Sequence, residues 1–439
     1  MTEETPSRVP QWIHKTLVPL FLLTFCPPTV FIFWYINTSL GGSFTAFWDL
    51  VQTNGLFPTL INIWKPVFFG SPTAWKILAC YSIFQLLLMR FVPGKPFLGP
   101  VTPKGNIPIY KANGFSCYLI SLVTFCLGSY AFHWFSPTII YDNMGPMLGA
   151  LNLFSLFFCF FLYLKGRFKP STTDHGISGN PFFDYYWGTE LYPRLFGWDI
   201  KQFTNCRFGM MGWSLILFSY AAKQQQLYGL SDSMIVAVAL QFIYISKFFL
   251  WETGYLRSLD IMHDRAGFYI CWGCLVWLPC IYTSPTLYLV HNPNHLGTYL
   301  ASGIFLAGAA SIIVNYLADR QRQVVRAKNG NCFVWRRRPH IIPAIYTTHN
   351  GETKRSLLLA SGWWGIARHF HYIPEILGSF FWSMPALFTH FIPYFYVAYL
   401  TLLLLDRAFR HDQRCADKYG PSWDQYCERV PYKIIPFVF

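Results

Sequence analysis

The chain has 439 residues, of which 53% are hydrophobic, 20% aromatic and only 12% charged. A soluble chain of this length would lack the polar residues needed to cover its surface, so the composition excludes an ordinary soluble protein and indicates a multi-span membrane protein. The formal net charge is +14, but the basic residues are spread over loops between apolar runs, which argues against nucleic acid as a partner.

Eight apolar runs are each long enough to cross a membrane. They cover residues 14–36, 73–90, 113–135, 145–164, 208–222, 233–250, 266–290 and 297–318. A ninth run, 373–405, is too long for one span and contains Pro385 and Pro393, so we interpret it as a tight helical hairpin. The sequence therefore predicts an all-α polytopic membrane protein with about ten transmembrane helices.

The distribution of basic residues predicts the orientation of these helices. All but four of the 34 Lys and Arg residues fall in segments that share one side of the membrane with the N-terminus; the exceptions are Lys65, Lys76, Lys223 and Lys247. The positive-inside rule then places both termini in the cytosol. The first apolar run lacks a small-residue cleavage site and is predicted to be a retained span, preceded by a short cytosolic N-terminus, residues 1–12.

Charged groups stand among aromatic residues in the loop 179–201. We single out Asp184, Tyr186, Trp187 and Glu190 as substrate-binding residues, because this mixture suits a wall where a flat apolar ligand meets water. The alternative is an interfacial aromatic belt with a buried Asp–Arg pair.

A second cluster of ionisable residues lies between the sixth and seventh predicted spans. Glu252, Asp260, His263 and Asp264 fall within thirteen residues, and ionisable groups beside apolar runs are costly unless they are paired or used. Glu252, Asp260 and His263 are therefore candidate catalytic acids. Such a segment offers too few good ligands for a metal ion, so no metal site is predicted.

Two further loops carry groups suited to a nucleotide cofactor. Arg322 and Arg326 are one helical turn apart, and in Gly362-Trp363-Trp364-Gly365 two glycines let the backbone approach a flat ring while the indoles stack on it. Trp364 is therefore a candidate cofactor residue, and Arg368 and His371 follow it closely in sequence. A Gly-x-Gly-x-x-Gly motif after a strand is absent, so a cofactor pocket would be formed by the C-terminal helices and cytosolic loops.

The C-terminal region adds Arg407, Arg410 and Arg414, which share one face if the helix continues. An arginine cluster of this kind binds phosphate; the alternative is a collar that contacts lipid headgroups. Specific residues follow at close spacing and favour the first interpretation: Cys415, Lys418, Tyr419, Gly420, Trp423 and Tyr426.

These C-terminal residues, the loop 179–201 and the Gly-Trp-Trp-Gly segment resemble the signatures of the sterol reductase family. His411 departs from the pattern, since the family usually has Asp there. The resemblance implies NADPH as cofactor, with Arg322 and Arg326 at the 2′-phosphate. It also implies that the pocket contains Trp364, Arg368, His371, Arg407 and Tyr426. It also implies one sterol-reductase membrane domain, residues 13–439, with N-terminal helices to residue 165 and a sterol- and NADPH-binding part from residue 166.

Stretches such as NPFFDYYWGTELYPR most resemble plant 7-dehydrocholesterol reductases within this family. We therefore expect reduction of the Δ7 bond of a 5,7-diene sterol; the alternative within the family is Δ14 reduction. The resemblance further implies an endoplasmic reticulum membrane, contact with membrane lipids, and other sterol-biosynthesis enzymes as partners. A lipid transporter or sterol-binding scaffold is the alternative of another class, although the chain shows no internal repeat.

Reduction of an isolated alkene requires a proton as well as a hydride, since nothing stabilises a carbanion. The proton donor must be a group kept protonated in a dry site. The sequence leaves two candidates open: Tyr426, or the group of Glu252, Asp260 and His263.

Overall fold

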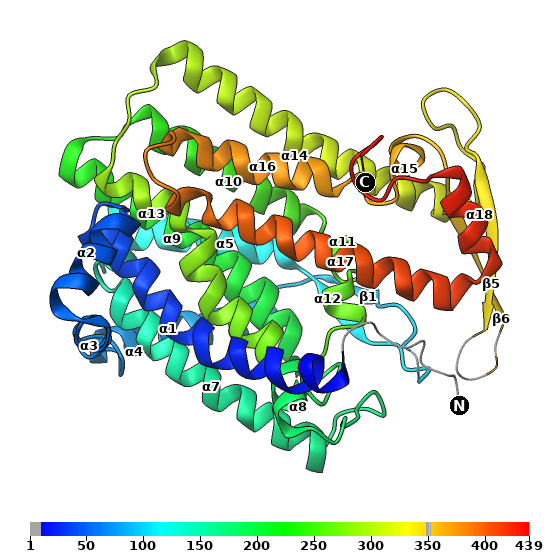
Figure 1. Ribbon diagram of the computed structural model, residues 1–439, viewed down its shortest axis with the longest axis horizontal. Coiled ribbons are helices and arrows are strands. Elements are labelled where there is room, and N and C mark those ends of the chain that lie inside the picture. The colour runs from blue at the N-terminus through cyan, green and yellow to red at the C-terminus, as the bar shows by residue number, and fades with distance from the viewer. Residues whose placement is uncertain (1–9, 103, 348–350, 352, 439) are drawn as a thin grey trace. The chain divides into compact units, whose positions relative to one another are not determined.

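The computed structural model describes residues 10–102, 104–347, 351 and 353–438. Within these residues the chain is mostly helical, and eight helices are long and apolar enough to cross a membrane (Figure 1). Their bounds are Ile13–Ser39, Pro72–Phe91, Gly114–Ala131, Met144–Phe168, Asp232–Leu250, Phe268–His291, Gly297–Ala327 and Ile392–Tyr419. The predicted polytopic membrane protein is confirmed. The predicted run 208–222 is helical but is not among the eight, so the count of about ten stays a prediction.

The chain divides into two compact units. Unit 1 runs to residue 234 and adds 245–293 and 389–393, and unit 2 comprises 235–244, 294–388 and the chain from 394 onward. Helix α10 (Asp232–Leu250) contributes to both.

Unit 1 contains most of the predicted spans. Its long helices are α1 (Val18–Ser39), α4 (Pro72–Phe91), α5 (Gly114–Cys126), α7 (Met144–Phe168), α9 (Met211–Tyr228) and the π-helical η4 (Phe268–Tyr282). Shorter helices are α2 (Phe44–Asn54), α3 (Leu56–Trp64), α6 (Ile139–Asp142), α8 (Pro181–Trp187), α11 (Glu252–Tyr255), α12 (Leu259–Met262) and α13 (Ser284–His291), with π-helical η1 (Ile13–Leu17), η2 (Leu127–Ala131) and η3 (Gln202–Met210). The helices η4 and α7 pack on each other.

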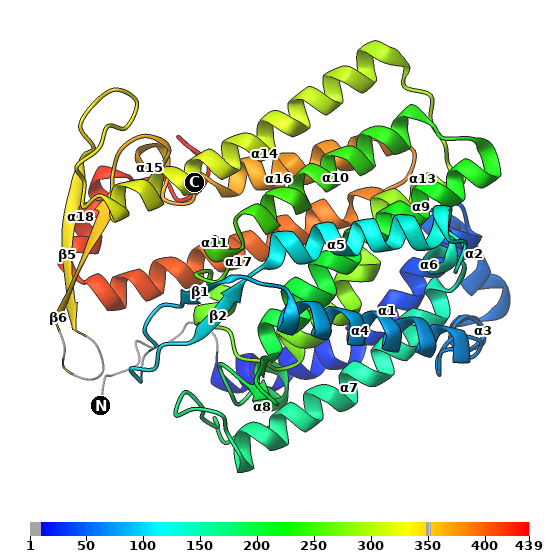
Figure 2. The same cartoon turned by 180° about the vertical axis from the view of Figure 1, so that it is seen from behind.

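Unit 2 is built on α14 (Gly297–Ala327), which lies alongside α16 (Tyr372–Ser383), as Figure 2 shows from behind. After α16 the chain passes through Pro385 and Pro393 and enters α17 (Phe395–Tyr419), which contacts α16. Trp382 and Tyr396 stack between the two helices with ring centroids 5.9 Å apart. The predicted helical hairpin is confirmed. In sequence, the short segments η5 (Met384–Ala386) and η6 (Ile392–Tyr394) connect α16 to α17.

Among the described residues, three small antiparallel hairpins accompany the predicted helices, and the sequence did not predict them. In unit 1 they pair β1 (Lys95–Leu98) with β2 (Ile109–Ala112) and β3 (Arg194–Leu195) with β4 (Trp198–Asp199). In unit 2, β5 (Ile341–Thr347) pairs with β6 (Thr353–Leu359), with Ile341 opposite Leu359. Both strands are rich in the β-branched or apolar residues that a half-buried sheet favours, and Asn350-Gly351 in the intervening sequence is a hairpin signal.

The β5–β6 hairpin gives unit 2 a second core. Helices α17 and α18 (Pro421–Arg429) pack against β5, at the end of unit 2 seen on the right of Figure 1. Trp423 and Tyr426 are buried there with Cys415, Ile342 and Leu358. The tail aromatics are therefore core residues of a small membrane-proximal subdomain, and burying each of them against the hairpin fixes the direction of α18.

Candidate functional site

The predicted cofactor residues of unit 2 gather around the short helix α15 (Trp363–Ile366). The Arg322 guanidinium carbon lies 3.9 Å from the centroid of the Trp364 ring, which is the geometry of a cation–π contact. Trp364 is buried, and its indole N–H donates to the Ala318 carbonyl at 2.8 Å. Two segments about forty residues apart in sequence are thereby joined through one indole, with the arginine on its face.

The turn that precedes α15 requires glycine. Gly362 has φ +61°, and a Cβ placed on it would lie 2.2 Å from the side-chain oxygen of Gln321. That oxygen accepts the backbone N–H of Trp363 at 3.0 Å, which satisfies a donor at the start of the helix. The positive φ disfavours any residue with a Cβ here, and a Cβ would also displace the Gln321 side chain from the Trp363 N–H.

Tyr426 closes the other side of α15. Its hydroxyl donates to the Trp364 carbonyl at 3.1 Å, and the side chain is buried. Burial raises the pKa of the Tyr426 phenol, although Arg322 and Arg368 act in the opposite direction. The phenol therefore keeps its proton at neutral pH, but it is not made more acidic, as an efficient proton donor would require.

Arg368 is buried and is held by the chain that follows α18. Its guanidinium donates to the carbonyls of Val430 at 2.9 Å and Pro431 at 3.1 Å, and to Asp412 at 3.2 Å. The buried Nε of Arg368 has no hydrogen-bond partner in the described part of the chain. The Arg368 guanidinium thus uses its terminal N–H groups to hold the tail and Asp412, and its Nε–H remains available.

Backbone hydrogen bonds extend this link. The Arg368 N–H donates to the Tyr432 carbonyl at 2.9 Å, and the His369 N–H donates to the Lys433 carbonyl at 2.7 Å. Residues 430–433 therefore run beside the segment after α15 and form part of the site's wall.

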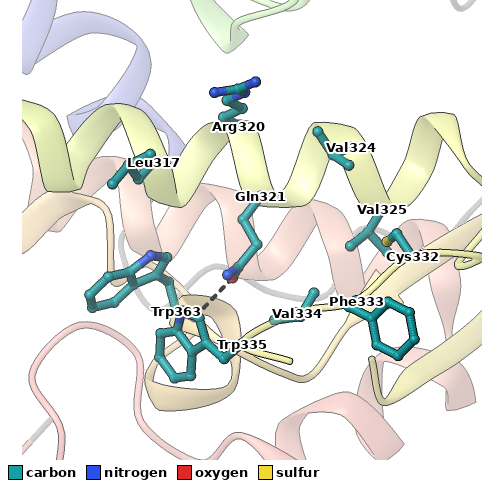
Figure 3. Close-up of a pocket in the computed structure, with 10 residues that line it drawn as sticks. All are labelled: Leu317, Arg320, Gln321, Val324, Val325, Cys332, Phe333, Val334, Trp335 and Trp363. Carbon is teal, nitrogen blue, oxygen red and sulfur yellow. Dashed lines mark hydrogen bonds between the residues drawn. The ribbon is translucent and has the colours of Figure 1, made fainter. Parts of the chain in front are cut away.

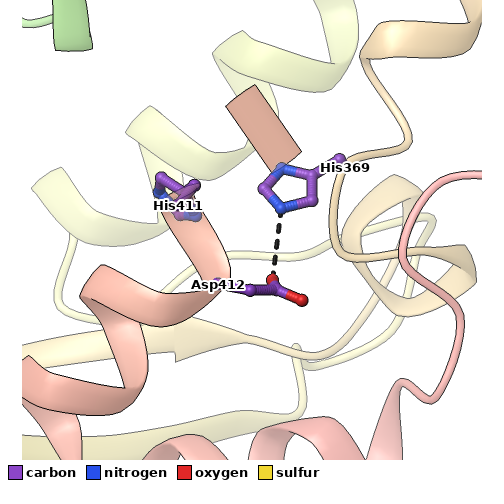
Figure 4. Close-up of side chains that lie close together, drawn as sticks. All are labelled: His369, His411 and Asp412. Carbon is purple, nitrogen blue, oxygen red and sulfur yellow. Dashed lines mark hydrogen bonds and ion pairs between the residues drawn. The ribbon is translucent and has the colours of Figure 1, made fainter. Parts of the chain in front are cut away.

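Asp412 is the acidic centre of this region, and the sequence did not reveal its role (Figure 4). One carboxylate oxygen lies 3.3 Å from His369 Nε2, and the other lies 3.2 Å from Arg368 and 3.6 Å from Lys433. Because a carboxylate only accepts, His369 Nε2 carries the proton in this pair. Burial lowers the pKa of His369, although Asp412 acts in the opposite direction.

His369, His411 and Asp412 are also close enough to share a metal ion. One ligand atom from each lies within 4.8 Å of the others. However, Asp412 already pairs with Arg368 and Lys433, and these cations would be repelled by a divalent ion. The surroundings of Asp412 fit a hydrogen-bonded network better than a metal centre.

His371 lies against the same indole as Arg322, with ring centroids of His371 and Trp364 4.9 Å apart. Its Nδ1 is buried without a hydrogen-bond partner in the described part of the chain. Burial, and then the charge of Arg322, lowers the pKa of His371 well below the ordinary range, and Arg407 on α17 adds to this effect. A neutral imidazole with an unsatisfied nitrogen is suited to bond a ligand.

Arg326, one turn after Arg322, is exposed and donates from Nε to the Leu357 carbonyl at 3.3 Å. This bond uses one of five donors, so the outer edge of the guanidinium remains available. The structure thus brings Arg322, Trp364, His371 and Tyr426 together, with Arg407 near His371 and Arg326 at the edge.

The other candidate catalytic residues lie in unit 1. Glu252 is buried and forms an ion pair with buried Arg207, and its second oxygen accepts the Gly114 N–H at 2.9 Å. These are the partners of an ionised carboxylate and not of a protonated acid. Arg207 also donates to Asn113 at 2.9 Å, so the pair connects three segments of unit 1.

Asp260 lies on α12, and His263 ends that helix. His263 is 47% exposed, and its Nδ1 lies 2.9 Å from buried Asp264. Buried Lys201 donates to the carbonyls of Ile261 at 2.8 Å and Asp264 at 2.6 Å, so it fixes the backbone of this segment. Burial lowers the pKa of Lys201 to about 8.

The candidate substrate residues also lie in unit 1, and the structure separates them into two pairs. Asp184 and Glu190 are buried acceptors: Asp184 accepts the Ser178 N–H at 2.8 Å, and Glu190 forms an ion pair with Lys165 at 2.7 Å. Their oxygens are thus engaged within the protein. Tyr186 and Trp187 instead pack with Tyr269, whose ring centroid lies 6.0 Å and 5.8 Å from theirs.

Comparison with known proteins gives a consistent result. The sequence profile of the Ergosterol biosynthesis ERG4/ERG24 family matches residues 29–439. The 7-dehydrocholesterol reductase of Arabidopsis thaliana is 53% identical over 97% of this chain and 99% of its own length. That of Xenopus laevis is 38% identical over 96% of this chain and 91% of its own. The Delta(14)-sterol reductase of Methylotuvimicrobium alcaliphilum is 35% identical over 96% and 94%.

Proposed function

Because the chain belongs to the Ergosterol biosynthesis ERG4/ERG24 family and is a sterol reductase, we propose that it uses NADPH to reduce the Δ7 double bond of a 5,7-diene sterol. The observation that supports NADPH as the cofactor is a group of cations around α15. They are Arg322 on the Trp364 face, Arg326 at the edge, and Arg407. Phosphates need such donors, and a 2′-phosphate distinguishes NADPH from NADH.

The residues around α15 fit a nicotinamide nucleotide. The buried Nδ1 of His371 and Nε of Arg368 lack partners among the described residues, so a polar ligand would satisfy both. In this proposal Arg322, Arg326 and Arg407 hold phosphates, and Trp364, Arg368, His371 and Tyr426 line the pocket. When bound, NADPH supplies a hydride.

The protein must supply the proton. Glu252 is a poor donor while Arg207 holds it in the ionised form, which leaves Tyr426, Asp260 and His263. A donor must lie in a dry site that tolerates positive charge on the sterol ring, and aromatic faces such as those of Tyr186 and Trp187 provide this. We propose these two residues as contacts of the sterol, and Asp184 and Glu190 as the groups that fix the segment carrying them.

The choice of double bond rests on the relatives. The 53% identity is to a protein named 7-dehydrocholesterol reductase, whereas the Delta(14)-sterol reductase of M. alcaliphilum is 35% identical. The test is to incubate purified protein and NADPH with a 5,7-diene and, separately, an 8,14-diene, and to identify the products by mass spectrometry. Reduction of only the 8,14-diene would replace the proposal with Δ14 reduction. Cofactor binding without turnover of either sterol would exclude both activities, and no cofactor binding at all would favour a transporter or scaffold.

We also propose that the protein resides in the endoplasmic reticulum membrane with both termini cytosolic, that residues 13–439 act as one membrane domain, and that other sterol-biosynthesis enzymes are partners. The asymmetry of Lys and Arg supports the orientation. Protease protection of tags placed at each end, in intact microsomes, tests it: protection of either tag would contradict a cytosolic terminus.

A further inference from the structure

A pocket of about 330 Å³ lies between α14, the loop that follows it and Trp363 of α15 (Figure 3). Five residues of α14 line it, between Leu317 and Val325, together with residues 332–335 of the following loop and Trp363. Gln321 and Val325 point from α14 toward this loop and Trp363. None of these lining residues is among the proposed contacts of the cofactor or of the sterol.

The pocket straddles the border between the apolar and charged parts of α14. The helix is apolar up to residue 318 and continues as Asp319-Arg320-Gln321-Arg322, so residues 317–325 lie where a span leaves the hydrocarbon layer. At this depth a membrane offers phosphates and glycerol oxygens next to the upper parts of acyl chains.

The loop that closes the pocket is strained at its tip. The backbones of Val334 and Arg337 exchange hydrogen bonds of 2.8 Å and 3.1 Å, and the two residues between them, Trp335 and Arg336, have φ of 49° and 65°. Positive φ at both central residues is the type I′ turn, which favours Asn-Gly. Bulky residues held in this conformation point to a function for the side chains that they present.

Those side chains combine exposed aromatic surface with positive charge. Phe333 is 75% and Trp335 54% exposed, and the Trp335 ring meets Trp363 edge-on at 5.0 Å. Arg320 is among the lining residues, and Arg336, Arg337 and Arg338 directly follow the lining residue Trp335 in sequence; all four are exposed. Within the described part of the chain, no carboxylate pairs with any of these four arginines.

We propose that this pocket binds an anionic phospholipid. Arg336–338 contact the phosphate and the acidic headgroup, and Trp335, Trp363 and Leu317 contact the glycerol end of an acyl chain. An aromatic and aliphatic floor with a basic rim matches an amphiphile with negative charge, whereas a free phosphate would make no use of the floor and a sterol none of the rim.

Native mass spectrometry of the purified full-length protein tests this with phosphatidylserine and phosphatidylcholine of identical acyl chains. The wild-type protein should retain phosphatidylserine in preference, and the retained mass distinguishes a phospholipid from inorganic phosphate. Each arginine removed should weaken retention about fivefold, so Arg336→Gln lowers it and the triple change at 336–338 abolishes it. Arg355→Gln, at an exposed position of β6 that does not line the pocket, is the matched control and should retain the lipid.

A second variant distinguishes the loss of lipid binding from the loss of folding. Trp335→Asn combined with Arg336→Gly installs the residues that a type I′ turn favours, so the protein should melt at the same temperature or higher while it retains less phosphatidylserine. Equal retention of the two lipids, retention of inorganic phosphate alone, or unchanged retention in the triple variant would each overturn the proposal.

Discussion

The central carbon of the Arg322 guanidinium lies over the Trp364 indole, 3.9 Å from the ring centroid. A cation on an indole face contributes about 0.5–2 kcal/mol, and the contact orients the guanidinium before any ligand arrives. The rest of the α15 region is organised around this indole: Ala318 accepts its N–H, Tyr426 holds its carbonyl, and His371 packs against its ring.

The two arginines of α14 give the first prediction. Arg326→Ala should weaken NADPH binding by about 10- to 150-fold, because a charge-assisted phosphate contact contributes about 1.5–3 kcal/mol. Binding of NADH, which lacks the 2′-phosphate, should change much less. Titrations of both cofactors into wild type, the variant and Arg355→Ala as a control measure this, and equal losses for the two cofactors would refute a role at the 2′-phosphate.

The Tyr426 hydroxyl gives the second. If the phenol delivers the proton, Tyr426→Phe should lower turnover roughly a hundredfold or more while NADPH affinity changes little. His263→Gln and Asp260→Asn, assayed in parallel, test the rival donors in unit 1. A near-normal rate for Tyr426→Phe would reduce the hydroxyl to a support of the Trp364 carbonyl, and the variant with the largest fall would then identify the donor.

The third prediction concerns the turn before α15. Gly362→Ala combines a left-handed backbone with a Cβ 2.2 Å from Gln321, so it should displace Trp363 from α14 and weaken cofactor binding at least tenfold. Gly303→Ala in helix α14, the helix that carries Gln321, is the control, since a Cβ there meets nothing within 4 Å and alanine favours a helix by about 0.5–1 kcal/mol. If both variants bind alike, the turn is not required for the site.

Glu252 gives the fourth. Glu252→Gln leaves the Arg207 charge buried without its counter-ion, and breaking such a pair costs about 3–5 kcal/mol. We therefore expect a marked fall in melting temperature in detergent. Asp406→Asn is the contrast, because it removes an exposed pair with Arg410 whose contribution is at most about 0.5 kcal/mol. A stable but inactive Glu252→Gln protein would instead restore Glu252 as a catalytic acid.

The fifth prediction is a pH dependence. The pKa of His371 is lower in the folded protein than its ordinary value, so the folded state favours the neutral imidazole. The unfolded chain then binds the proton more readily, and stability is lost as pH falls below about 6.5 toward the folded pKa. Melting temperature should fall from pH 7.5 to pH 5, and His371→Asn should reduce this dependence; an identical pH profile for the variant would contradict the assignment.

Membrane helices could be predicted from the sequence because length and hydropathy alone determine them, and the two prolines in 373–405 located the hairpin. The β5–β6 hairpin was not predicted, because 341–347 is a short apolar run, and a run of this length does not by itself distinguish a strand from other structure. Only the strand pairing explains why Trp423 and Tyr426 are buried.

Within the candidate site, the arginines and tryptophans could be predicted because each group lies within a few residues of the sequence. The contact of Gln321 with Gly362 and the bonds of Asp412 to Arg368 and His369 join segments about forty residues apart, so no local pattern contains them. Glu252 was predicted to be a catalytic acid because it lies beside an apolar run. Its partner Arg207 lies 45 residues earlier, so the sequence pattern could not reveal the ion pair, and only the structure shows it.

A single proteolytic cut before residues 430–433 would remove the segment that holds Arg368 and His369, with little change in the size of the chain. Arg429 is exposed at the end of α18, and the carbonyls that hold Arg368 and His369 begin at the next residue. A trypsin-like cut after Arg429 during purification would remove only the last ten residues of the sequence and leave all the candidate membrane helices in place. Such a preparation would look intact on a gel, yet it would have lost the segment that anchors Arg368, so the mass of the C-terminal peptide is the appropriate measure of sample quality before any activity is compared.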